Sequence, residues 1–404
     1  MVIDSKKYNG MCRCGKEHVM QTELSVIESG CLKRAELYFE KLGISGFTVA
    51  VYDENTYKAT KDRHVKADCE IILSPDNLHA NEHGVDLLKT QLPENADVLV
   101  AVGSGTVHDI VRYCAYEMGA DFVSCPTAAS VDGFCSSVAA MTWHGCKKTL
   151  TAVAPRLVVA DTEVIKNAPI RLARSGFGDM VGKYVALTDW KIGNILSDEF
   201  YCERIADMTL EATKKVIDSA KGIVTGDESA YENLMYGLLL SGLAMQMMGN
   251  SRPASGAEHH ISHMIEMLEL SDALHGEKVG VGTLIAIGEY KRLSACADIH
   301  FKDYTPFTRT QILSAFGEDK TDDIIAENKN DAAAFVTAKT LSERWKKICD
   351  ELDKLPDFTS LYSELGIKPT LSDIDVDENM TQTLVDCSPM VRNRLTLMRL
   401  RKCL

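Results

Sequence analysis

Hydrophobic positions change their spacing once along the chain. Over the first 160 residues, short apolar runs alternate with segments of helical periodicity; the runs are "GFTVAVYD", "CEIILSP", "ADVLVAVG", "DFVSCPT" and "RLVVAD". Continuous apolar strands separated by helices are typical of a parallel sheet that is covered on both faces. The clearest unit is a strand at 97–102, a helix to about residue 118, and a strand at 121–125. The pattern also predicts a helix over 21–42, ending before Gly43.

Beyond about residue 163 the strand pattern ends and helical periodicity continues towards the C-terminus. The predicted helices cover 171–195, 198–224, 228–249, 256–269 and 277–297. We therefore expect an α/β domain over residues 1–162 and an all-helical domain over residues 163–404. The basic tail "RNRLTLMRLRKCL" predicts a further amphipathic helix.

Composition narrows the classes of partner. The net charge of −14 over 404 residues argues against nucleic acid or an anionic membrane as the main partner, and an anionic substrate would need a locally positive pocket. Thirteen scattered cysteines, an odd number, fit free thiols in a reducing compartment. The N-terminus lacks a secretory apolar core and no apolar run is long enough to span a bilayer, so we expect a cytoplasmic protein without membrane insertion.

A glycine turn follows the clearest predicted strand. In "VLVAVGSGTVHDI", Gly103, Ser104, Gly105 and Thr106 stand at the mouth of a helix. Unpaired N–H groups and the helix dipole can bind a diphosphate there, and glycine allows the ligand to approach the backbone. The third glycine of the dinucleotide fingerprint is absent, so a tight turn without a ligand remains an alternative. Asp53, which ends an earlier strand, either accepts hydrogen bonds from a ribose and favours NAD over NADP, or forms the turn.

The loop "CPTAASVDGFCSS" follows the next predicted strand. Its small polar residues are Thr127, Ser130, Asp132 and Ser136. Open α/β sheets bind ligands beyond the carboxyl ends of their strands, which is where this loop begins. The alternative is a capped loop that leads into a helix.

Four of the eleven histidines fall within 17 residues: His259, His260, His263 and His275. His259 and His263 are spaced i, i+4 and share one face of the predicted helix, whereas His260 points about 100° away. His275 lies at a predicted break between helices. The spacing is compatible with metal ligation, and a helix without metal is equally compatible with it.

Asp179 supplies a carboxylate in "RSGFGDMVGKYVALTDWK". It follows Gly176 and Gly178, is predicted to start a helix, and is spaced i, i+4 from Lys183. It is either a helix cap with a salt bridge or a carboxylate that joins histidines at a metal. One oxygen and two nitrogen ligands would leave open positions, as at catalytic sites, and would admit zinc, nickel or iron.

The motifs "GSGT", "PTAASVDG", "GFGDMVGKYVALTDW", "SRPASGAEHHISH" and "LHGEKVGVG", in this order, resemble those of the glycerol-1-phosphate dehydrogenase family, whose bacterial members are the nearest match in length. That family lies within the iron-dependent alcohol dehydrogenase, glycerol dehydrogenase and dehydroquinate synthase superfamily. The resemblance implies a dehydroquinate synthase-like fold, with a Rossmann-like α/β domain before an all-α domain. It also implies an NAD(P)- and metal-dependent oxidoreductase that interconverts dihydroxyacetone phosphate and sn-glycerol 1-phosphate, a product linked to lipid biosynthesis. Exposed helical surface in a two-domain enzyme leads us to expect a homodimer.

The resemblance also implies roles for single residues. It assigns the metal to Asp179, His259 and His275, and it makes Asp132, Asp179 and His263 substrate contacts, with His263 on the proton path. Candidates for the substrate phosphate are Lys148, Lys183 and Arg252, because they lie in or beside the motifs; each is alternatively an ordinary salt-bridge partner. The expected coenzyme contacts are Asp53, Gly103, Ser104, Gly105, Thr106, Val107, His108, Asp109, Thr127, Ala128, Ala129, Ser130 and Ser136.

Three other functions remain open from the sequence. The chain can be a glycerol or polyol dehydrogenase without a phosphate requirement, a dehydroquinate synthase-like lyase, or a metal-binding scaffold without catalysis. Cys12, Cys14 and His18 in "MCRCGKEH" are most simply part of a loosely packed arm. A second metal site there would need a fourth ligand, which the sequence does not identify.

Overall fold

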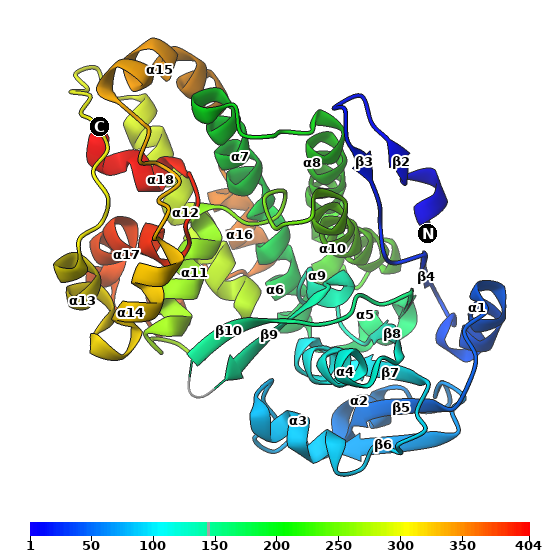
Figure 1. The fold of residues 1–404 in the computed structure, drawn as a ribbon. Helices are drawn as coiled ribbons and strands as arrows, with labels where there is room; N and C mark the ends of the chain where they lie inside the picture. The colour runs from blue at the N-terminus through cyan, green and yellow to red at the C-terminus, as the bar shows by residue number, and fades with distance from the viewer. Residues whose placement is uncertain (144–145) are drawn as a thin grey trace. The chain divides into compact units, whose positions relative to one another are not determined.

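The apolar runs of the first 161 residues form a seven-stranded sheet in the computed structural model, which describes residues 1–143 and 146–404 (Figure 1). The strand order is β1-β4-β11-β8-β7-β5-β6, and neighbours are parallel except β1, which is antiparallel to β4. The five predicted strands are confirmed. The strands are β1 (Val2–Asp4), β4 (Leu24–Glu28), β5 (Thr48–Asp53), β6 (Cys69–Leu73), β7 (Val98–Gly103), β8 (Asp121–Pro126) and β11 (Leu157–Asp161).

The single helix predicted over 21–42 is wrong. Its first part is strand β4, and only α1 (Ala35–Leu42) is α-helical. Strand β4 pairs in parallel with β11, with Leu24 opposite Leu157, and four of its five residues are buried. Burial between distant strands therefore outweighs the local periodicity of this segment.

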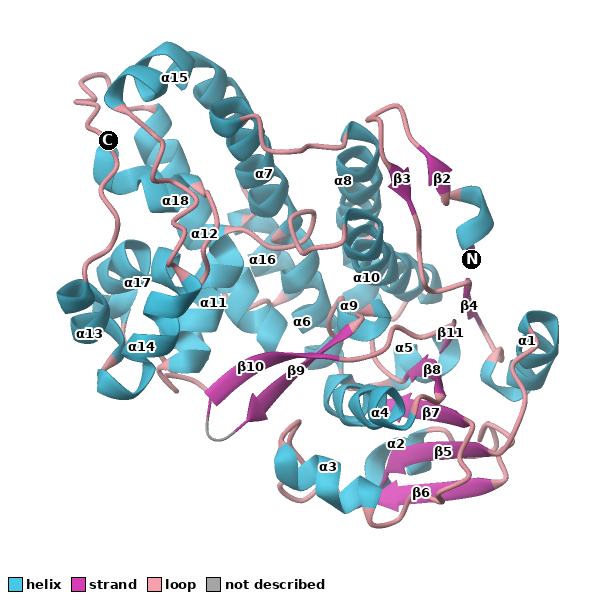
Figure 2. Cartoon of the chain, viewed as in Figure 1, coloured by secondary structure: helices cyan, strands magenta, loops and turns pink. Residues whose placement is uncertain are grey.

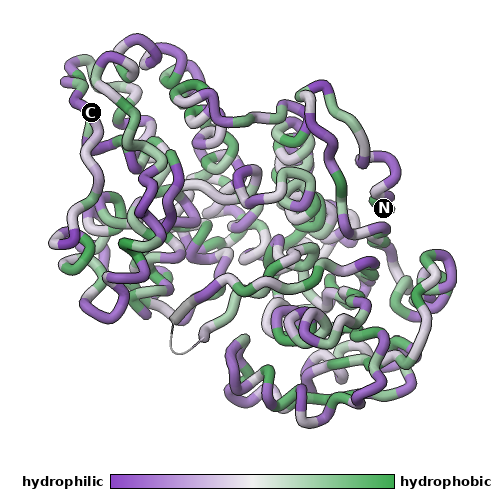
Figure 3. Tube along the Cα trace, in the orientation of Figure 1, coloured by the Kyte–Doolittle hydropathy of each residue, from purple (hydrophilic) through white to green (hydrophobic). Residues whose placement is uncertain are grey.

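Alternate residues of the central strands enter two separate cores. In β7, Leu99 and Ala101 pack with residues of α3 (Glu82–Lys89) and α4 (Gly105–Met118) on one face. Val98, Val100 and Val102 pack on the other face with residues that include Leu32 and Ala35 at the start of α1. A strand buried on both faces reads as a continuous apolar run, which is why the sequence pattern finds it. Figure 3 shows the hydropathy of these strands along the trace.

Two hairpins outside the main sheet were not predicted (Figure 2). One pairs β9 (Val138–Trp143) with β10 (Cys146–Thr151), and the other pairs β2 (Gly10–Met11) with β3 (Glu17–His18). In β9, Ala139 and Met141 are buried and join the core on the α3 and α4 side of the sheet. The hairpin β9–β10 therefore extends the cover of that face.

The chain forms two compact units, Met1–Met180 with Glu211–Asn250, and Val181–Leu210 with Ser251–Leu404. Helical residues after 162 thus contribute to both units, and the domain boundary at 162 stays a prediction. Besides α1, α3 and α4, the first unit contains α2 (Glu54–Ala59), α5 (Thr162–Asn167), α9 (Ala220–Thr225) and α10 (Glu228–Met248). It also contains α6 (Ile170–Val181) except for the last residue of that helix. Helix α8 (Glu203–Asp218) begins in the second unit and ends in the first. The second unit contains α7 (Lys183–Ser197), α11 (Ala257–Met267), α12 (His275–Ser294), α13 (Arg309–Phe316), α14 (Glu318–Glu327), α15 (Ala338–Leu352), α16 (Thr359–Leu365), α17 (Thr381–Cys387) and α18 (Leu397–Leu400).

The helical periodicity of the sequence predicts most of these helices, but it does not predict all of the residues at which they begin and end. The helix predicted over 171–195 is two helices, α6 and α7, separated at Gly182. Of the helices in the described part of the chain, none is both long and apolar enough to cross a membrane.

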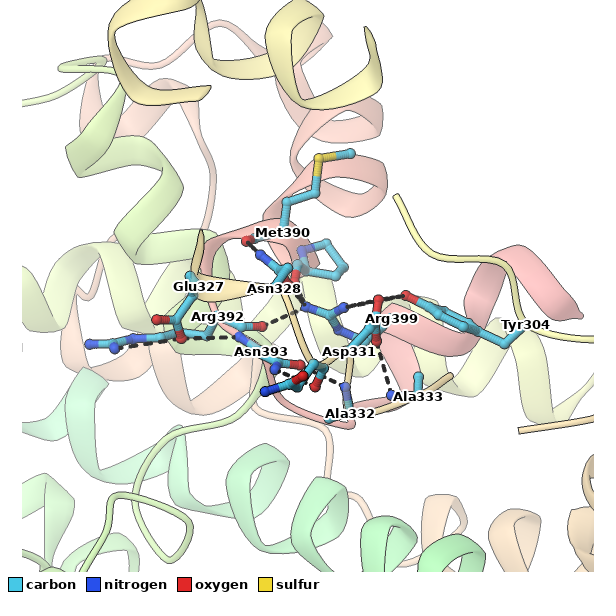
Figure 4. Close-up of polar contacts among 12 residues, drawn as sticks. Tyr304, Glu327, Asn328, Asp331, Ala332, Ala333, Met390, Arg392, Asn393 and Arg399 are labelled. Atoms are coloured by element: carbon cyan, nitrogen blue, oxygen red, sulfur yellow. Dashed lines mark hydrogen bonds and ion pairs between the residues drawn. The ribbon is translucent and has the colours of Figure 1, made fainter. Parts of the chain in front are cut away.

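The basic tail packs into the second unit, and the amphipathic helix predicted for it is limited to the short α-helix α18 (Leu397–Leu400). Arg399, in the short helix α18, has a fully buried side chain and an ion pair with Asp331 at 3.0 Å (Figure 4). Its guanidinium also donates to the carbonyl oxygens of Pro389 and Arg392 and to the side chain of Asn328. One buried cation therefore links α18 to two other segments of this unit, residues 328–331 and 389–392.

Candidate functional site

Three adjacent parallel strands end along one edge of the sheet, β5 at Asp53, β7 at Gly103 and β8 at Pro126. After β5 the chain passes outwards to β6 and then returns to β7 on the opposite side of β5. The strand order therefore reverses between β5 and β7. Open α/β sheets bind ligands beyond the carboxyl ends of the strands at such a reversal, so the topology marks this edge as the candidate coenzyme site.

The glycine turn has the form that the sequence predicts. Ser104 is the N-cap of α4 and makes no capping bond with its side chain, so the first N–H groups of the helix lack a side-chain cap. A Cβ on Gly103 would lie 2.7 Å from Cβ of Val107, whereas the nearest atom to a Cβ on Gly105 is 3.8 Å away. Gly103 is thus required by strand–helix packing, and Gly105 leaves room for a ligand at the helix N-terminus.

Two of the expected coenzyme contacts in α4 turn their side chains inwards. Val107 is buried, and the buried imidazole of His108 donates from Nδ1 to the carbonyl of Ser104 at 2.9 Å. Its Nε2 accepts from the hydroxyl of Ser124 at 2.8 Å. Burial lowers the pKa of His108 to about 3, so the ring is neutral at ordinary pH. These side chains fix α4 on the sheet and are not available for contact with a coenzyme.

The loop 127–130 after β8 is held from two sides. The N–H of Thr127 donates to the last carbonyl of β7 at 3.0 Å, and the hydroxyl of Ser175 in α6 donates to the carbonyl of Ser130 at 3.2 Å. A Cβ on Gly176 in α6 would lie only 2.1 Å from the carbonyl oxygen of Ala129. The loop is therefore positioned by direct backbone contact with α6.

Asp53 and Ser136, also expected to contact the coenzyme, bond with their own neighbourhood. Oδ1 of Asp53 accepts from the N–H groups of Asn55 and Thr56 at 2.8 and 2.9 Å, as the N-cap of α2. The hydroxyl of Ser136 donates to the carbonyl of Val138 at 2.8 Å and accepts from its N–H at 3.0 Å. Asp53 thus forms the turn, which was the alternative to a ribose contact, although both of its hydrogen bonds use the same oxygen, Oδ1.

Asp132 and Asp179 are linked within the first unit. The N–H of Asp132 donates to Oδ2 of Asp179 at 3.0 Å, and the hydroxyl of Ser241 in α10 donates to Oδ2 of Asp132 at 2.9 Å. Asp179 is fully buried and lies in the last turn of α6, so the prediction that it starts a helix is wrong. A Cβ on Gly242 would lie 2.8 Å from the carbonyl oxygen of Asp132, so α10 also fixes this loop.

Three histidines of the second unit form a cluster. The ring centroids of His259 and His275 are 5.4 Å apart, and those of His263 lie 6.0 Å from His259 and 6.2 Å from His275. His259 and His263 share one face of α11, as their spacing predicts, and His275 is the first residue of α12. Potential ligand atoms of His259 and His275 lie within 4.8 Å of each other.

Two carboxylates that sequence reasoning missed orient these imidazoles. Nδ1 of His259 donates to Glu258 at 2.7 Å, and Nδ1 of His275 lies 3.4 Å from Glu266, which also pairs with Lys278 at 3.0 Å. Burial raises the pKa of Glu258 to about 7, whereas the pKa of Glu266 is held well below its usual range, against burial, by His275 and its other charged neighbours. With Nδ1 engaged by a carboxylate, Nε2 is the nitrogen that each ring presents to a cation. These partners fit a metal-binding role for both histidines.

The two remaining histidines have different surroundings. His260 is fully buried, and within residues 1–143 and 146–404 neither of its ring nitrogens has a hydrogen-bond partner. Burial lowers the pKa of His263 to about 3, so its ring is neutral at ordinary pH. A role of His263 on the proton path stays a prediction.

The cations expected to bind a substrate phosphate lie in different environments. Arg252 is buried and forms a bidentate pair with Glu199, and it donates to the carbonyl of Leu395 at 2.9 Å. The fully buried Nζ of Lys183 donates to the carbonyl of Ala254 at 3.1 Å. Lys148 is exposed on β10. The salt-bridge alternative thus describes Arg252, and Lys148 is the cation of the three that faces solvent.

The sequence model of the family described as iron-containing alcohol dehydrogenase matches residues 26–169. A glycerol-1-phosphate dehydrogenase (NAD(P)+) of Bacillus licheniformis is 38% identical over 304 residues, which is 71% of this chain and 75% of the relative. The enzyme of the same name from Pyrococcus horikoshii is 36% identical, over 61% of this chain and 71% of the relative.

A solved structure shows the same fold at low sequence identity. The iron-containing alcohol dehydrogenase of Thermococcus thioreducens superposes with a TM-score of 0.60 at 16% identity, covering 94% of this chain and 93% of that one. The expected dehydroquinate synthase-like arrangement, with an α/β part and a large helical part, is thereby confirmed. At this identity the likeness concerns the fold alone.

Proposed function

Because the chain belongs to the glycerol-1-phosphate dehydrogenase family, we propose that it interconverts dihydroxyacetone phosphate and sn-glycerol 1-phosphate by hydride transfer with a nicotinamide coenzyme. The names of its relatives support this activity. The observation that carries the proposal is the pair of imidazoles, His259 and His275, whose Nδ1 atoms face carboxylates. That arrangement is typical of ligating histidines and has no evident purpose in a metal-free helix pair.

We assign the metal to Asp179, His259 and His275. Two nitrogen donors and one oxygen donor suit zinc, nickel or iron and leave positions for a substrate oxygen. A bound divalent cation supplies Lewis acidity, which polarises the C2 carbonyl of the ketone and favours loss of the C2 hydroxyl proton in reverse. The chain prepares these donors beforehand, since Asp132 fixes the Asp179 carboxylate and Glu258 fixes His259.

The coenzyme is assigned to the edge where β5, β7 and β8 end. The diphosphate would accept hydrogen bonds from the uncapped N-terminus of α4 beside Gly105, and the loop 127–130 would lie along it. Oδ2 of Asp53 would accept from the ribose hydroxyls, which favours NAD over NADP because a carboxylate repels a 2′-phosphate. The residues from Val107 to Asp109 contribute backbone rather than side chains.

The substrate is assigned to the residues around the proposed metal. Asp132 and His263 would hold the hydroxyl groups of the three-carbon chain, and Asp179 would lie against the reacting carbon. Lys148 is the strongest of the three candidate cations for the phosphate, because Lys183 and Arg252 already bond with the protein interior. We further propose a cytoplasmic homodimer, in keeping with the free thiols of the described cysteines.

The test is NADH oxidation driven by dihydroxyacetone phosphate, before and after chelation, with zinc, nickel and iron restored singly. We expect turnover to disappear on chelation and to return with one of the metals. Replacing His259 with Ala or Asp179 with Asn should lower kcat/KM by on the order of 1,000-fold while the far-UV circular dichroism persists, because several kcal/mol of polarisation are lost.

His300→Ala is the matched control, since His300 is exposed in the loop after α12 of the same unit. It should keep wild-type turnover and metal content. Equal rates with glycerol and sn-glycerol 1-phosphate in the NAD+-reducing direction would contradict the phosphate requirement. Full activity of metal-free His259→Ala protein would refute the metal assignment.

A further inference from the structure

The N-terminal hairpin β2–β3 brings two cysteines and a histidine together. Gly10 pairs with His18 across the hairpin, and the N–H of Cys12 donates to the carbonyl of Lys16 at 2.9 Å. Gly15 closes the turn with φ of +84°, a left-handed conformation that favours glycine. The sequence "CRCGKEH" thus folds into a tight turn whose donors converge, and it is not a loosely packed arm.

The three donors lie at the spacing of a metal site. Ligand atoms of Cys12, Cys14 and His18 all lie within 4.8 Å of one another, and Sγ of Cys14 is 3.2 Å from Nε2 of His18. The ring of His18 is buried, with only 2% exposed. Its Nδ1 donates to the carbonyl of Met247 in α10 at 2.9 Å. That bond fixes the tautomer in which Nε2 carries a lone pair towards the sulfur atoms, as in ligating histidines.

We propose that Cys12, Cys14 and His18 bind one zinc ion in a site separate from the catalytic metal. All three donors come from residues 12–18 of the first unit. The acceptor that fixes His18, the carbonyl of Met247, belongs to the same unit.

Thiolates and imidazole are the donors that zinc has at structural sites. The ion therefore stabilises the fold of the hairpin. It would fasten a hairpin that already bonds to α10, where the side chain of Gln246 accepts from the N–H groups of Gln21 and Thr22 at 2.7 and 3.1 Å.

Cobalt substitution of the full-length protein distinguishes this site from the proposed catalytic one. Thiolate ligands give Co²⁺ an intense charge-transfer absorption in the near ultraviolet, which the nitrogen and oxygen donors of Asp179, His259 and His275 do not give. We expect about two metal ions per chain and a charge-transfer band in the wild type. Cys14→Ser should lose the band and about one equivalent of metal, whereas His259→Ala should keep the band.

Cys296→Ser is the matched control, because Cys296 is exposed and distant in sequence from the hairpin; it should keep both metal equivalents. Cys12→Ser should weaken the band, and an unchanged band would overturn the assignment of that ligand. The wild-type spectrum tests the site even where a variant fails to fold. Absence of the band from reduced wild-type protein that binds a single metal ion, or an intact mass showing a Cys12–Cys14 disulfide, would overturn the proposal.

Discussion

Replacement of Gly176 by Ala tests whether α6 positions the loop assigned to the coenzyme. The new Cβ would lie 2.1 Å from the carbonyl oxygen of Ala129 and 3.1 Å from Cδ1 of Leu238. Leu238 is a side chain and can adjust, whereas the carbonyl belongs to the backbone of the loop 127–130. The substitution therefore moves the loop, the helix or both.

The magnitude follows from that contact. Real Cβ contacts are essentially never below 3.0 Å, so the loop and the helix must separate by about 0.9 Å. Overpacking of this kind costs about 1–3 kcal/mol, against a gain of up to about 1 kcal/mol in helix propensity for alanine over glycine. The expected net loss of stability is about 1 kcal/mol. A displacement near 1 Å of a coenzyme-binding loop should lower kcat/KM by on the order of 10- to 100-fold.

Urea unfolding and steady-state kinetics with NADH measure the two effects separately. Gly288→Ala is the matched control, because Gly288 is also in a helix interior, in α12, and a Cβ there has nothing within 4 Å. It should gain about 0.5–1 kcal/mol and keep wild-type kinetics. If Gly176→Ala is stabilised to the same extent and binds NADH as the wild type does, α6 does not set the position of the loop.

Two stability predictions follow from buried polar groups. His108 has a pKa of about 3 in the folded protein and near 6.5 when unfolded. Its contribution to the free energy of unfolding is therefore fully present above pH 6.5, and it falls by up to about 1 kcal/mol per pH unit as the pH decreases towards 3. Urea unfolding at pH 7 and pH 5 should show a shallower pH dependence for His108→Gln than for the wild type, and equal slopes would contradict the assignment. Arg399→Ala should cost about 3–5 kcal/mol, because it leaves the Asp331 carboxylate, whose side chain is only 5% exposed, without its counter-charge. The matched control Arg309→Ala breaks only exposed pairs and should cost less than about 1 kcal/mol, and a similar small loss for Arg399→Ala would show that the buried pair is not needed.

The sequence predicts those elements of the fold that are determined by their own residues. Strands β5, β7 and β8 are apolar on both faces and are bounded by turns, so their residues alone identify them. Strand β4 exists because it pairs with β11, more than 120 residues away, and the local pattern of apolar residues does not indicate that partner. The hairpins β2–β3 and β9–β10 are short and have mixed polarity, which leaves no period to detect.

The candidate site likewise has features that the local sequence predicts and features that depend on the folded chain. The turn at Gly103 to Thr106 and the spacing of His259 and His263 are local, and the structure places them as expected. Glu266 could have been found, because it stands seven residues after His259 and so shares its helix face. Glu258 could not, since an adjacent residue normally points away, and its bond to His259 depends on the fold around the N-terminus of α11. Burial of Arg252 and Lys183 is likewise a property of the folded unit.

The histidine cluster shows why composition within a motif does not determine the role of each residue. His259 and His260 are neighbours of the same type, yet one donates to a carboxylate and the other is enclosed without a hydrogen-bond partner among the described residues. A ring whose Nδ1 is fixed presents Nε2 in one direction and can hold a cation, whereas a ring without such a partner acts as a packed side chain. The same criterion selects His18, where the acceptor is a backbone carbonyl instead of a carboxylate. A fixed Nδ1 is not sufficient, since His108 also donates to a carbonyl, but its Nε2 already accepts from Ser124. The partners of both ring nitrogens, more than the spacing of the histidines, therefore separate the residues that are prepared to bind metal from those that are not.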